Sequence, residues 1–299
     1  MADVSIVLCT RNRCEQLRQA LAVMRDLDRP PHAQCEIVVV DNDSSDRTRA
    51  VIDGFASSSP HAVRYVFEGM RGLAYARNAG VRASSAAIIA CTDDDCLVAR
   101  DWIARLVDEF ARQTSVGVIG GRVELHDTRD APLATRTALD ARAVGSVEDV
   151  FALMIGCNLA FRREVFDAIG GYDVRFGRPA GTTGDDMDFV YRALRHGFAV
   201  AYSPLPVVKH AHGRRTQEQV RAARRMYARG KGAFFAKHVT RGDWSLVRQV
   251  YWELRAAARQ AMRARKSHGS AAEEIRFVGD FLGGGSYFLL RSLSRSRSD

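Results

Sequence analysis

Short apolar runs alternate with stretches of helical periodicity through the first third of the chain. Leu17, Leu21 and Met24 recur every three or four positions, which predicts a helix. Four other runs are rich in β-branched residues and have the length of buried strands: residues 4–9, 36–40, 63–67 and 86–91. Strands that alternate with helices indicate parallel βαβ units, so we expect an α/β fold.

The pattern continues less regularly to about residue 213. We expect strands at residues 116–123, 156–161, 198–202 and 207–210, and helices at 102–110, 165–169 and 185–196. Residues 128–148 show little periodicity and predict a loop. From Arg214 onward the character changes, and long basic stretches predict helices at residues 220–238, 246–264 and 275–293.

The positive charge of the chain lies in its last third. The formal net charge is +9, but residues 214–299 hold 19 Lys/Arg against 7 Asp/Glu, a local charge of +12. Arg221, Arg224, Arg225 and Arg229 share a helical spacing and predict a basic face. Such a face suits an anionic lipid surface, and we expect peripheral membrane contact there. The aromatic residues of this segment fit helix packing, so we expect no nucleic-acid partner.

The cysteines and the hydropathy pattern indicate a cytoplasmic protein. The six cysteines form no CxxC pair and several lie in apolar runs, which favours buried thiols in a reducing compartment. The first residues lack a basic n-region and an apolar h-region. No run approaches the roughly 18 apolar residues of a membrane-spanning helix. We therefore expect a cytoplasmic location, with peripheral contact at the inner face of the membrane.

Three adjacent carboxylates follow the fourth predicted strand, at Asp93, Asp94 and Asp95. Adjacent carboxylates repel one another unless a cation is present. Alternate side chains share a face of an extended segment, so Asp93 and Asp95 can point together. Oxygen ligands of this kind suit Mg²⁺ or Mn²⁺, which usually also bind substrate phosphates. An acidic, solvated loop is the alternative.

Polar residues end the neighbouring strands as well. Thr10, Asp41 and Asp93 each follow an apolar strand, and ligands of open α/β sheets bind beyond the carboxyl ends of the strands. We expect the three to converge on one crevice, with Asp41 contacting a ribose or base. Asp43 serves this crevice or caps the next helix. Arg77 lies on a predicted helix nearby, where it pairs with a diphosphate or remains an ordinary surface residue.

Two further clusters are candidates for chemistry. Asp185 and Asp186 open a predicted helix, whose dipole favours the ionised form that a general base requires. The same dipole is a sufficient structural reason for acidic residues there. His210 follows a short strand and is a candidate metal ligand, as is His212 less directly. A pair of histidines beside a basic segment is also compatible with no metal.

Several motifs occur in the order and spacing of a known family. They are residues 4–13 (VSIVLCTRNR), 37–46 (IVVVDNDSSD), 72–80 (GLAYARNAG), 93–95 (DDD), 101–102 (DW), 171–173 (GYD) and 184–186 (GDD). Each motif alone is weak, but the ordered set resembles glycosyltransferase family 2 with the GT-A fold, up to about His212. This resemblance implies an inverting, metal-dependent enzyme with a Rossmann-like, mostly parallel sheet flanked by helices.

The resemblance also implies roles for individual residues. Asp93 and Asp95 match the family's DxD motif, with Asp95 the more direct ligand of Mn²⁺ or Mg²⁺ and His210 a further metal ligand. Asp186 matches the base, while Asp185 stands where the family more often has Glu, so either acid is a candidate catalytic residue. The implied donor-binding residues are Thr10, Arg11, Asn12, Asp41, Asp43, Arg77, Asp93 and Asp94.

Together these expectations define a transferase with a basic tail. Residues 1–213 form the catalytic domain, with a nucleotide-binding half at about 1–98 and an acceptor-binding half at about 99–213, and residues 214–299 form a basic helical region. The donor is a nucleotide-sugar, most commonly UDP-linked, and the acceptor is a hydroxyl of a glycan, a lipid-linked glycan or another glycoconjugate. A sugar-phosphate nucleotidyltransferase is the first alternative, although no Gly-rich loop follows the first strand. A non-catalytic nucleotide-sugar-binding scaffold is the second.

Overall fold

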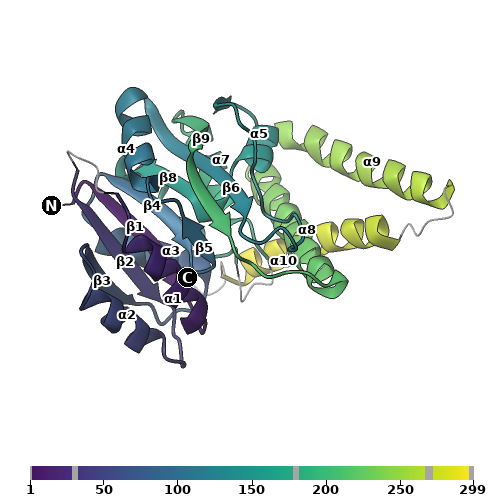
Figure 1. Cartoon of the computed structure of the whole chain (residues 1–299). Helices are drawn as coiled ribbons and strands as arrows, with labels where there is room; N and C mark the ends of the chain where they lie inside the picture. The colour runs from purple at the N-terminus through teal and green to yellow at the C-terminus, as the bar shows by residue number, and fades with distance from the viewer. Residues whose placement is uncertain (1, 29–32, 178–181, 267–271, 296–299) are drawn as a thin grey trace. The chain divides into compact units, whose positions relative to one another are not determined.

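The computed structural model describes residues 2–28, 33–177, 182–266 and 272–295. The chain forms two compact units, of which the first comprises residues 1–173 and 186–214 and the second residues 174–185 and 215–299. The first unit contains the β-sheet with its flanking helices, and the second contains the long helices α8, α9 and α10 (Figure 1).

Four parallel strands build one half of the sheet, in the spatial order β3-β2-β1-β4. Their bounds are β1 (Val4–Thr10), β2 (Cys35–Asp41), β3 (Ala62–Phe67) and β4 (Ile88–Asp93). The helices of the unit are α1 (Cys14–Met24), α2 (Thr48–Ala56), α3 (Leu73–Ala83), α4 (Trp102–Arg112), α5 (Val147–Leu153), α6 (Arg163–Ile169) and α7 (Asp185–Arg195), the last beginning in the second unit. The predicted α/β fold with parallel βαβ units is confirmed.

Different helices cover the two faces of this sheet. On one face, alternate strand residues such as Ile6 and Ile37 pack with the apolar sides of α1, α2 and α4 in one hydrophobic core. On the other face, Gly80 of α3 lies so close to Val7 and Val40 that a Cβ would stand within 2.8 Å of their side chains. Strands β1, β2 and β4 are almost entirely buried, which explains their continuous apolar sequence, whereas the edge strand β3 is partly exposed.

The other half of the sheet pairs in both directions. It continues from β4 through β8 (Leu159–Arg162), β6 (Val116–Leu125), β9 (Ala199–His210) and β5 (Cys96–Val98), and β7 (Arg142–Val144) also pairs with β9. Strand β8 is antiparallel to both β4 and β6, whereas β6 and β9 are parallel. The described sheet is therefore parallel in its first half and mixed in its second.

Three local predictions need correction here. The two short strands predicted around residues 204–206 are one strand, β9, and its register with β6 shifts between Gly121 and Arg122. This irregularity lets the pairing pass through Pro204 and Pro206, because prolines are tolerated at bulges. The predicted loop at 128–148 contains β7 and a bridge from Arg136 to Val123. The predicted strand at 156–161 begins as a 3₁₀ turn (Gly156–Asn158) before β8.

The second unit is built on close helix packing. Its helices are α8 (Gln217–Thr240), α9 (Ser245–Lys266) and α10 (Ala272–Arg295). Gly232 of α8 and Gly284 of α10 have no space for a Cβ, because each faces a backbone carbonyl of the other helix, at Phe281 and Arg229. None of the described helices combines the length and the apolar composition that crossing a bilayer requires.

Candidate active site

The predicted polar strand ends lie together at one edge of the parallel half-sheet. In the strand register Thr10 of β1 lies opposite Asp41 of β2, and Cys9 lies opposite Asp93 of β4. Thr10 and Asp41 are each 4% exposed, while Asp93 is partly exposed. The sheet thus brings these three side chains to the same edge, where strands of this type present ligand-binding residues.

Asp41 and Asp43 have different surroundings. Both carboxylate oxygens of Asp41 accept hydrogen bonds, from the backbone N–H of Ser44 at 2.9 Å and from the Tyr65 hydroxyl at 3.2 Å. Asp43 adopts a positive φ of 60° and pairs with Arg71 at 2.6 Å. These contacts hold the loop after β2 in one shape and leave the Asp43 carboxylate half-buried.

The loops after β1 and β2 are joined by Asn12. Its φ is 53°, a left-handed conformation that asparagine tolerates better than most residues. The side-chain oxygen of Asn12 accepts a hydrogen bond from the backbone N–H of Ser45 at 2.7 Å, and the backbone N–H of Asn12 donates to Oγ of Ser44 at 3.0 Å. Arg11 beside it is exposed. Of the two loop residues expected to bind the donor, Asn12 therefore connects the loops and Arg11 extends from them.

Arg13 holds two of the three adjacent carboxylates. Its guanidinium lies 2.7 Å from Oδ1 of Asp94 and 2.9 Å from Oδ2 of Asp95, and the Thr10 hydroxyl donates to Asp94 at 2.8 Å. The chain turns at these positions, so neighbouring rather than alternate aspartates share a partner. Arg13 is the last residue of the motif at residues 4–13, but the sequence alone predicted no role for it.

The three carboxylates experience different electrostatic environments. Burial and the nearby charge of Asp95 raise the pKa of Asp94 to about 7, against the opposing effect of Arg13. Burial also raises the pKa of Asp95, but hydrogen bonds and charges from His210 and Arg13 outweigh it and hold that pKa well below its usual range. Asp93 pairs separately with Arg77, at 3.1 Å. Positively charged side chains therefore pair with Asp93 and stabilise the ionised form of Asp95.

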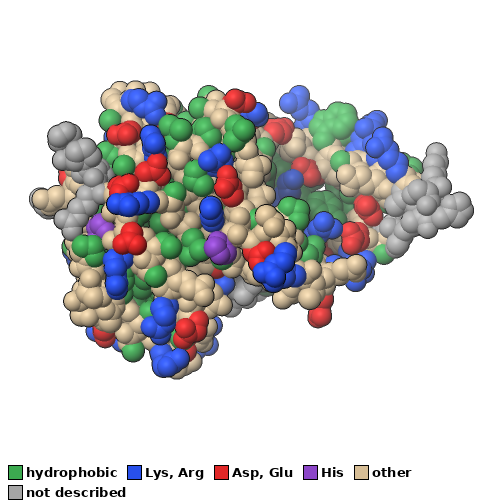
Figure 2. Space-filling model, in the orientation of Figure 1, with side chains coloured by type: hydrophobic (Ala, Val, Ile, Leu, Met, Phe, Trp, Pro, Cys, Tyr) green, Lys and Arg blue, Asp and Glu red, His purple; other side chains and the backbone are tan. Residues whose placement is uncertain are grey.

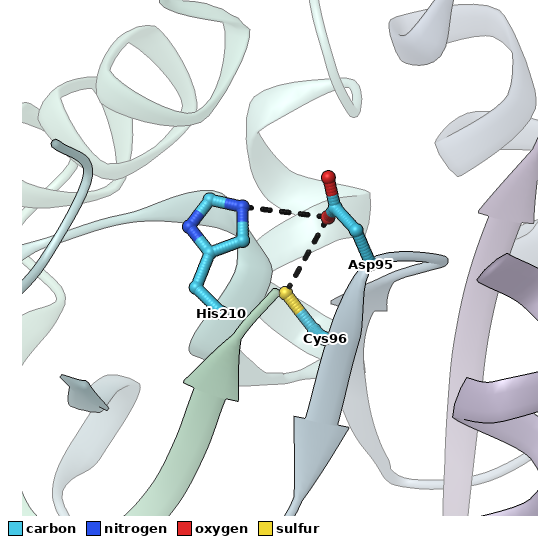
Figure 3. A group of neighbouring side chains, drawn as sticks. All are labelled: Asp95, Cys96 and His210. Carbon is cyan, nitrogen blue, oxygen red and sulfur yellow. Dashed lines mark hydrogen bonds and ion pairs between the residues drawn. The ribbon is translucent and has the colours of Figure 1, made fainter. Parts of the chain in front are cut away.

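His210 and Cys96 complete a small cluster around Asp95 (Figure 3). Strands β5 and β9 set Cys96 opposite His210, and Nε2 of His210 lies 3.4 Å from Oδ1 of Asp95. The Cys96 sulfur lies 3.8 Å from the same oxygen. The potential ligand atoms of the three residues all lie within 4.8 Å of one another. Cys96 is the member that sequence reasoning missed, because only the antiparallel pairing of β5 with β9 brings His210 to it and to Asp95.

The donor atoms of this cluster fit a divalent cation such as Mn²⁺. A carboxylate oxygen and an imidazole nitrogen are ligands that Mn²⁺ accepts, and both side chains are buried to 7% exposure. Burial lowers the pKa of His210, but the hydrogen bond to Asp95 and nearby negative charges raise it to about 9, so its Nε2 must release a proton to bind metal. Burial raises the pKa of Cys96 well above its ordinary value, which keeps it a thiol and a poor ligand.

His212 lies beside His210 but belongs to a different set of contacts. Its Nδ1 accepts from the backbone N–H of Arg214 at 2.9 Å, and Nε2 lies 3.2 Å from the carbonyl oxygen of Ala131. Asp130 is 3.8 Å away and accepts from the backbone N–H of Gly213. Burial and the charge of His210 lower the pKa of His212. These contacts anchor the end of β9 and leave His210 as the histidine that faces Asp95.

A second acidic position lies next to Arg77. Oδ2 of Asp186, in the first turn of α7, accepts from the backbone N–H of Gly156 at 2.7 Å. A Cβ on Gly156 would stand 2.7 Å from Nη2 of Arg77 and 2.9 Å from Cβ of Asp186. Arg77 is 3% exposed and reaches Asp93 on its other side. Asp93, Arg77, Gly156 and Asp186 therefore form a continuous line of contacts.

The two acids at the start of α7 differ in their environment. Asp186 is partly exposed and lies in the first compact unit, whereas Asp185 is 4% exposed and lies in the second. A base must reach an acceptor hydroxyl, so the more accessible carboxylate is better suited to the role. Gly156 was not among the predicted site residues, because its segment has no periodic pattern that marks it.

Models of two related families match the chain. The model described as glycosyl transferase family 2 matches residues 5–170, and the model described as glycosyl transferase family group 2 matches residues 88–264. The first covers the parallel strands, the acidic triplet and β8. The second reaches through β9 into the helices of the second unit.

Curated relatives are similar over the same part of the chain. The succinoglycan biosynthesis protein ExoM of Rhizobium meliloti (strain 1021) is 30% identical over 207 residues, 67% of this chain and 64% of that protein. The glycosyltransferase AglE of Haloferax volcanii is 26% identical over 67% of this chain and 64% of its own length. A glucosyl-dolichyl phosphate glucuronosyltransferase of the same organism is 26% identical over 58% and 57%. The chain spans less than two thirds of the length of these relatives.

A solved structure shares the fold over nearly the whole chain. The mannosyltransferase PcManGT of Pyrobaculum calidifontis, in complex with GDP-Man and Mn²⁺, superposes with a TM-score of 0.66 and 22% identity. The match covers 98% of this chain and 86% of that one. At this identity the similarity establishes the fold.

Proposed function

The chain belongs to glycosyl transferase family 2, and we propose that this transferase moves a sugar from a nucleotide-sugar donor to an acceptor hydroxyl with inversion at the anomeric carbon. The observation that carries the proposal is the line of contacts from Asp93 through Arg77 and Gly156 to Asp186. In this line the buried guanidinium of Arg77 lies between Asp93, a member of the acidic cluster, and the partly exposed carboxylate of Asp186. We assign the reaction to residues 1–213, with the donor bound mainly by residues 1–98 and the acceptor by residues 99–213.

The donor would bind beyond the strand ends at β1, β2 and β4. Thr10 and Asp41 lie where a nucleoside would meet the sheet edge, and the loops carrying Arg11, Asn12 and Asp43 flank them. Arg77 is already buried in the folded protein. Binding of the donor would therefore not have to remove water from its guanidinium. Its guanidinium would then stabilise the diphosphate as negative charge develops there.

A divalent cation, Mn²⁺ or Mg²⁺, is part of the proposal. Asp95 and His210 would hold it, with Asp93 at the more exposed side. When bound, the cation neutralises charge on the departing nucleoside diphosphate. Arg13 offsets part of the negative charge of Asp94 and Asp95 beside this position.

The chemical step is a single displacement in which Asp186 acts as the base. Its carboxylate accepts the proton of the acceptor hydroxyl, whose oxygen forms a bond to the anomeric carbon. The bond from that carbon to the diphosphate oxygen breaks, and the nucleoside diphosphate leaves from the opposite face. The backbone N–H groups of Gly156 and Met187 donate to Oδ2 and Oδ1 of Asp186, at 2.7 and 2.9 Å, and orient the carboxylate, whose remaining lone pairs would accept the proton. Asp185 is the alternative base.

The family resemblance and the names of the relatives limit the choice of donor and acceptor. A UDP-sugar is our first choice of donor, and a GDP-sugar is the second because PcManGT was solved with GDP-Man. The names of the relatives include succinoglycan biosynthesis and a glucosyl-dolichyl phosphate acceptor. We propose a hydroxyl of a surface polysaccharide, a lipid-linked glycan or another glycoconjugate as acceptor, in the cytoplasm and with peripheral contact at the inner face of the membrane.

Product analysis tests the proposed reaction. The protein is incubated with UDP-, GDP- and dTDP-sugars and a panel of lipid-linked and free glycans, with Mn²⁺, Mg²⁺ or chelator. We expect release of one nucleoside diphosphate that depends on the metal and on an acceptor, and a product whose anomeric configuration, measured by NMR, is inverted. A retained configuration would contradict the single displacement. With pyrophosphate added, conversion of a nucleotide-sugar into a nucleoside triphosphate and a sugar 1-phosphate would favour a nucleotidyltransferase, and donor binding without any turnover would favour a scaffold.

A further inference from the structure

Exposed apolar side chains concentrate in the second unit. Of the thirteen large hydrophobic residues that are exposed in the described part of the chain, nine lie between Trp244 and Leu290. Trp244 is 71% exposed and Tyr251 is 53% exposed. Large aromatic side chains are seldom left in water without a partner, so their clustering marks a contact surface.

Helix α9 carries the aromatic members of this group on one side. Its exposed large apolar residues and three of its arginines recur every three or four positions, so they share one helical face together with Trp244 just before the helix. We call this surface the α9 outer face, and it comprises Trp244, Val247, Arg248, Tyr251, Trp252, Arg255, Arg259 and Met262. The opposite side is buried at Leu246 and Ala257, and Glu253 there pairs with Lys231 of α8 at 2.6 Å.

Charge on α9 is almost entirely positive. Residues 245–266 contain six Lys/Arg and a single acid, Glu253, which belongs to the buried side. Figure 2 shows Lys/Arg side chains beside hydrophobic ones over the position of α9 in Figure 1. Aromatic and aliphatic residues mixed with arginine, without acidic residues, match the boundary between lipid headgroups and acyl chains.

Arg255 shows how the two kinds of side chain combine. Its guanidinium donates to the Tyr251 hydroxyl at 2.7 Å and lies 5.3 Å from the ring centroid of Trp252. The aromatic rings of Tyr251 and Trp252 thus hold the charged guanidinium of Arg255 beside the Tyr251 hydroxyl. It can therefore face lipid phosphates while the rings enter the apolar layer.

The basic face that the sequence suggested on α8 has different partners. Arg224 lies 3.1 Å from Glu273, Arg225 lies 3.1 Å from Asp280, and Arg221 lies 3.9 Å from Glu273, all on α10. These pairs neutralise much of the charge that would attract a lipid surface. The arginines of α8 thus join α8 to α10, and the arginines of α9 are the better candidates for membrane contact.

We propose that the α9 outer face lies in the headgroup region of an anionic bilayer, with the helix parallel to the membrane plane. This inference assigns the peripheral contact of the proposed function to defined residues, but it rests on α9 alone and not on the transfer reaction. Tryptophan and tyrosine prefer this depth, and the arginine side chains are attracted to anionic lipid headgroups. Val247 and Met262 offer aliphatic surface, which favours lipid over RNA as the partner.

Vesicle binding of the full chain, without donor or acceptor, tests the proposal. Flotation uses vesicles of phosphatidylglycerol with phosphatidylcholine and vesicles of phosphatidylcholine alone. Brominated lipids report insertion by quenching tryptophan, because Trp102 is buried in the core and Trp244 and Trp252 carry the exposed signal. The variants are Trp244→Ser/Trp252→Ser, Arg248→Gln/Arg255→Gln/Arg259→Gln, and the charge-matched control Arg221→Gln/Arg224→Gln/Arg225→Gln.

The expected result is binding to the anionic vesicles, with tryptophan quenching. Both α9 variants should bind at least about tenfold more weakly, as the loss of several favourable groups implies, and the α8 control should change less than about threefold. Far-UV circular dichroism and nucleotide binding verify that each variant folds. The proposal is overturned if the wild type binds no vesicle, if the α8 control loses as much as the α9 triple, or if the tryptophans instead hold a dimer or an RNA that excludes vesicles.

Discussion

The backbone N–H of Gly156 donates a 2.7 Å hydrogen bond to Oδ2 of Asp186. The same glycine leaves no space for a side chain, because a Cβ would stand 2.7 Å from Nη2 of Arg77. One backbone position therefore sets the distance between the carboxylate that we propose as base and the cation that pairs with Asp93.

Replacing Gly156 by alanine should disturb both neighbours at once. The added methyl must displace the guanidinium of Arg77 or the side chain of Asp186, and a small misplacement of catalytic groups costs about 100-fold in rate. We expect kcat to fall by about 10- to 100-fold for Gly156→Ala. The matched control is Gly145→Ala, because no heavy atom lies within 4 Å of a Cβ built on Gly145. Equal rates for the two variants would contradict the assigned contact.

Replacing Asp186 by asparagine should remove the base and preserve its shape. General-base catalysis contributes about 10²- to 10⁴-fold, so we expect kcat to fall by that factor while donor affinity stays unchanged. The comparison is Asp185→Asn, which tests the alternative acid at the start of α7, and Asp167→Asn serves as an exposed control. Full activity of Asp186→Asn together with an inactive Asp185→Asn would transfer the role to Asp185.

Asp46 stabilises the beginnings of two helices. One carboxylate oxygen accepts from the backbone N–H of Cys14 in α1 at 3.0 Å, and the other accepts from the N–H of Thr48 in α2 at 3.0 Å. Loss of a helix cap costs about 1 kcal/mol, so Asp46→Ala should lower the free energy of unfolding by about 1–2 kcal/mol. Urea unfolding measures it. Asp53→Ala, which removes only an exposed pair with Arg49, should change stability by less than about 1 kcal/mol.

The contribution of Asp46 should also depend on pH. Burial raises its pKa, but hydrogen bonds from Thr48 and Cys14 outweigh it and lower the pKa from 3.8 to about 2. A carboxyl whose pKa is lower in the folded state stabilises the fold above its unfolded pKa and loses that effect as pH falls toward 2. The difference in stability between wild type and Asp46→Ala should therefore be larger at pH 6 than at pH 3. A difference that grows on acidification would refute this account.

The parallel half of the sheet could be predicted because its signals are local. Val4–Thr10 and Cys35–Asp41 are apolar runs of strand length, and the polar residue that ends each one marks the ligand edge. The register of Thr10 with Asp41 follows from the parallel pairing that βαβ units impose. The positions of the candidate donor-binding residues were therefore predictable from sequence, although their roles stay predictions.

The second half of the sheet depends on long-range pairing that no local pattern encodes. His210 reaches Asp95 and Cys96 only because β9 pairs with β5, a strand more than a hundred residues earlier in the chain. Gly156 meets Arg77 and Asp186 through a 3₁₀ turn that has no periodic signature. The arginines of α8 gave a correct helical spacing, but their acidic partners lie on α10, so their pairing required the packed helices.

Calorimetry of nucleotide-sugar binding tests whether the protein binds its donor through a metal at Asp95. UDP-, GDP- and dTDP-sugars are titrated into wild type, Asp95→Ala and Asp186→Asn, each with Mn²⁺ and with chelator. We expect that one nucleotide binds only with metal, that Asp95→Ala abolishes this binding, and that Asp186→Asn retains it. If no nucleotide binds with or without metal, or if binding is the same in chelator and in Asp95→Ala, a metal-dependent nucleotide-sugar transferase is contradicted.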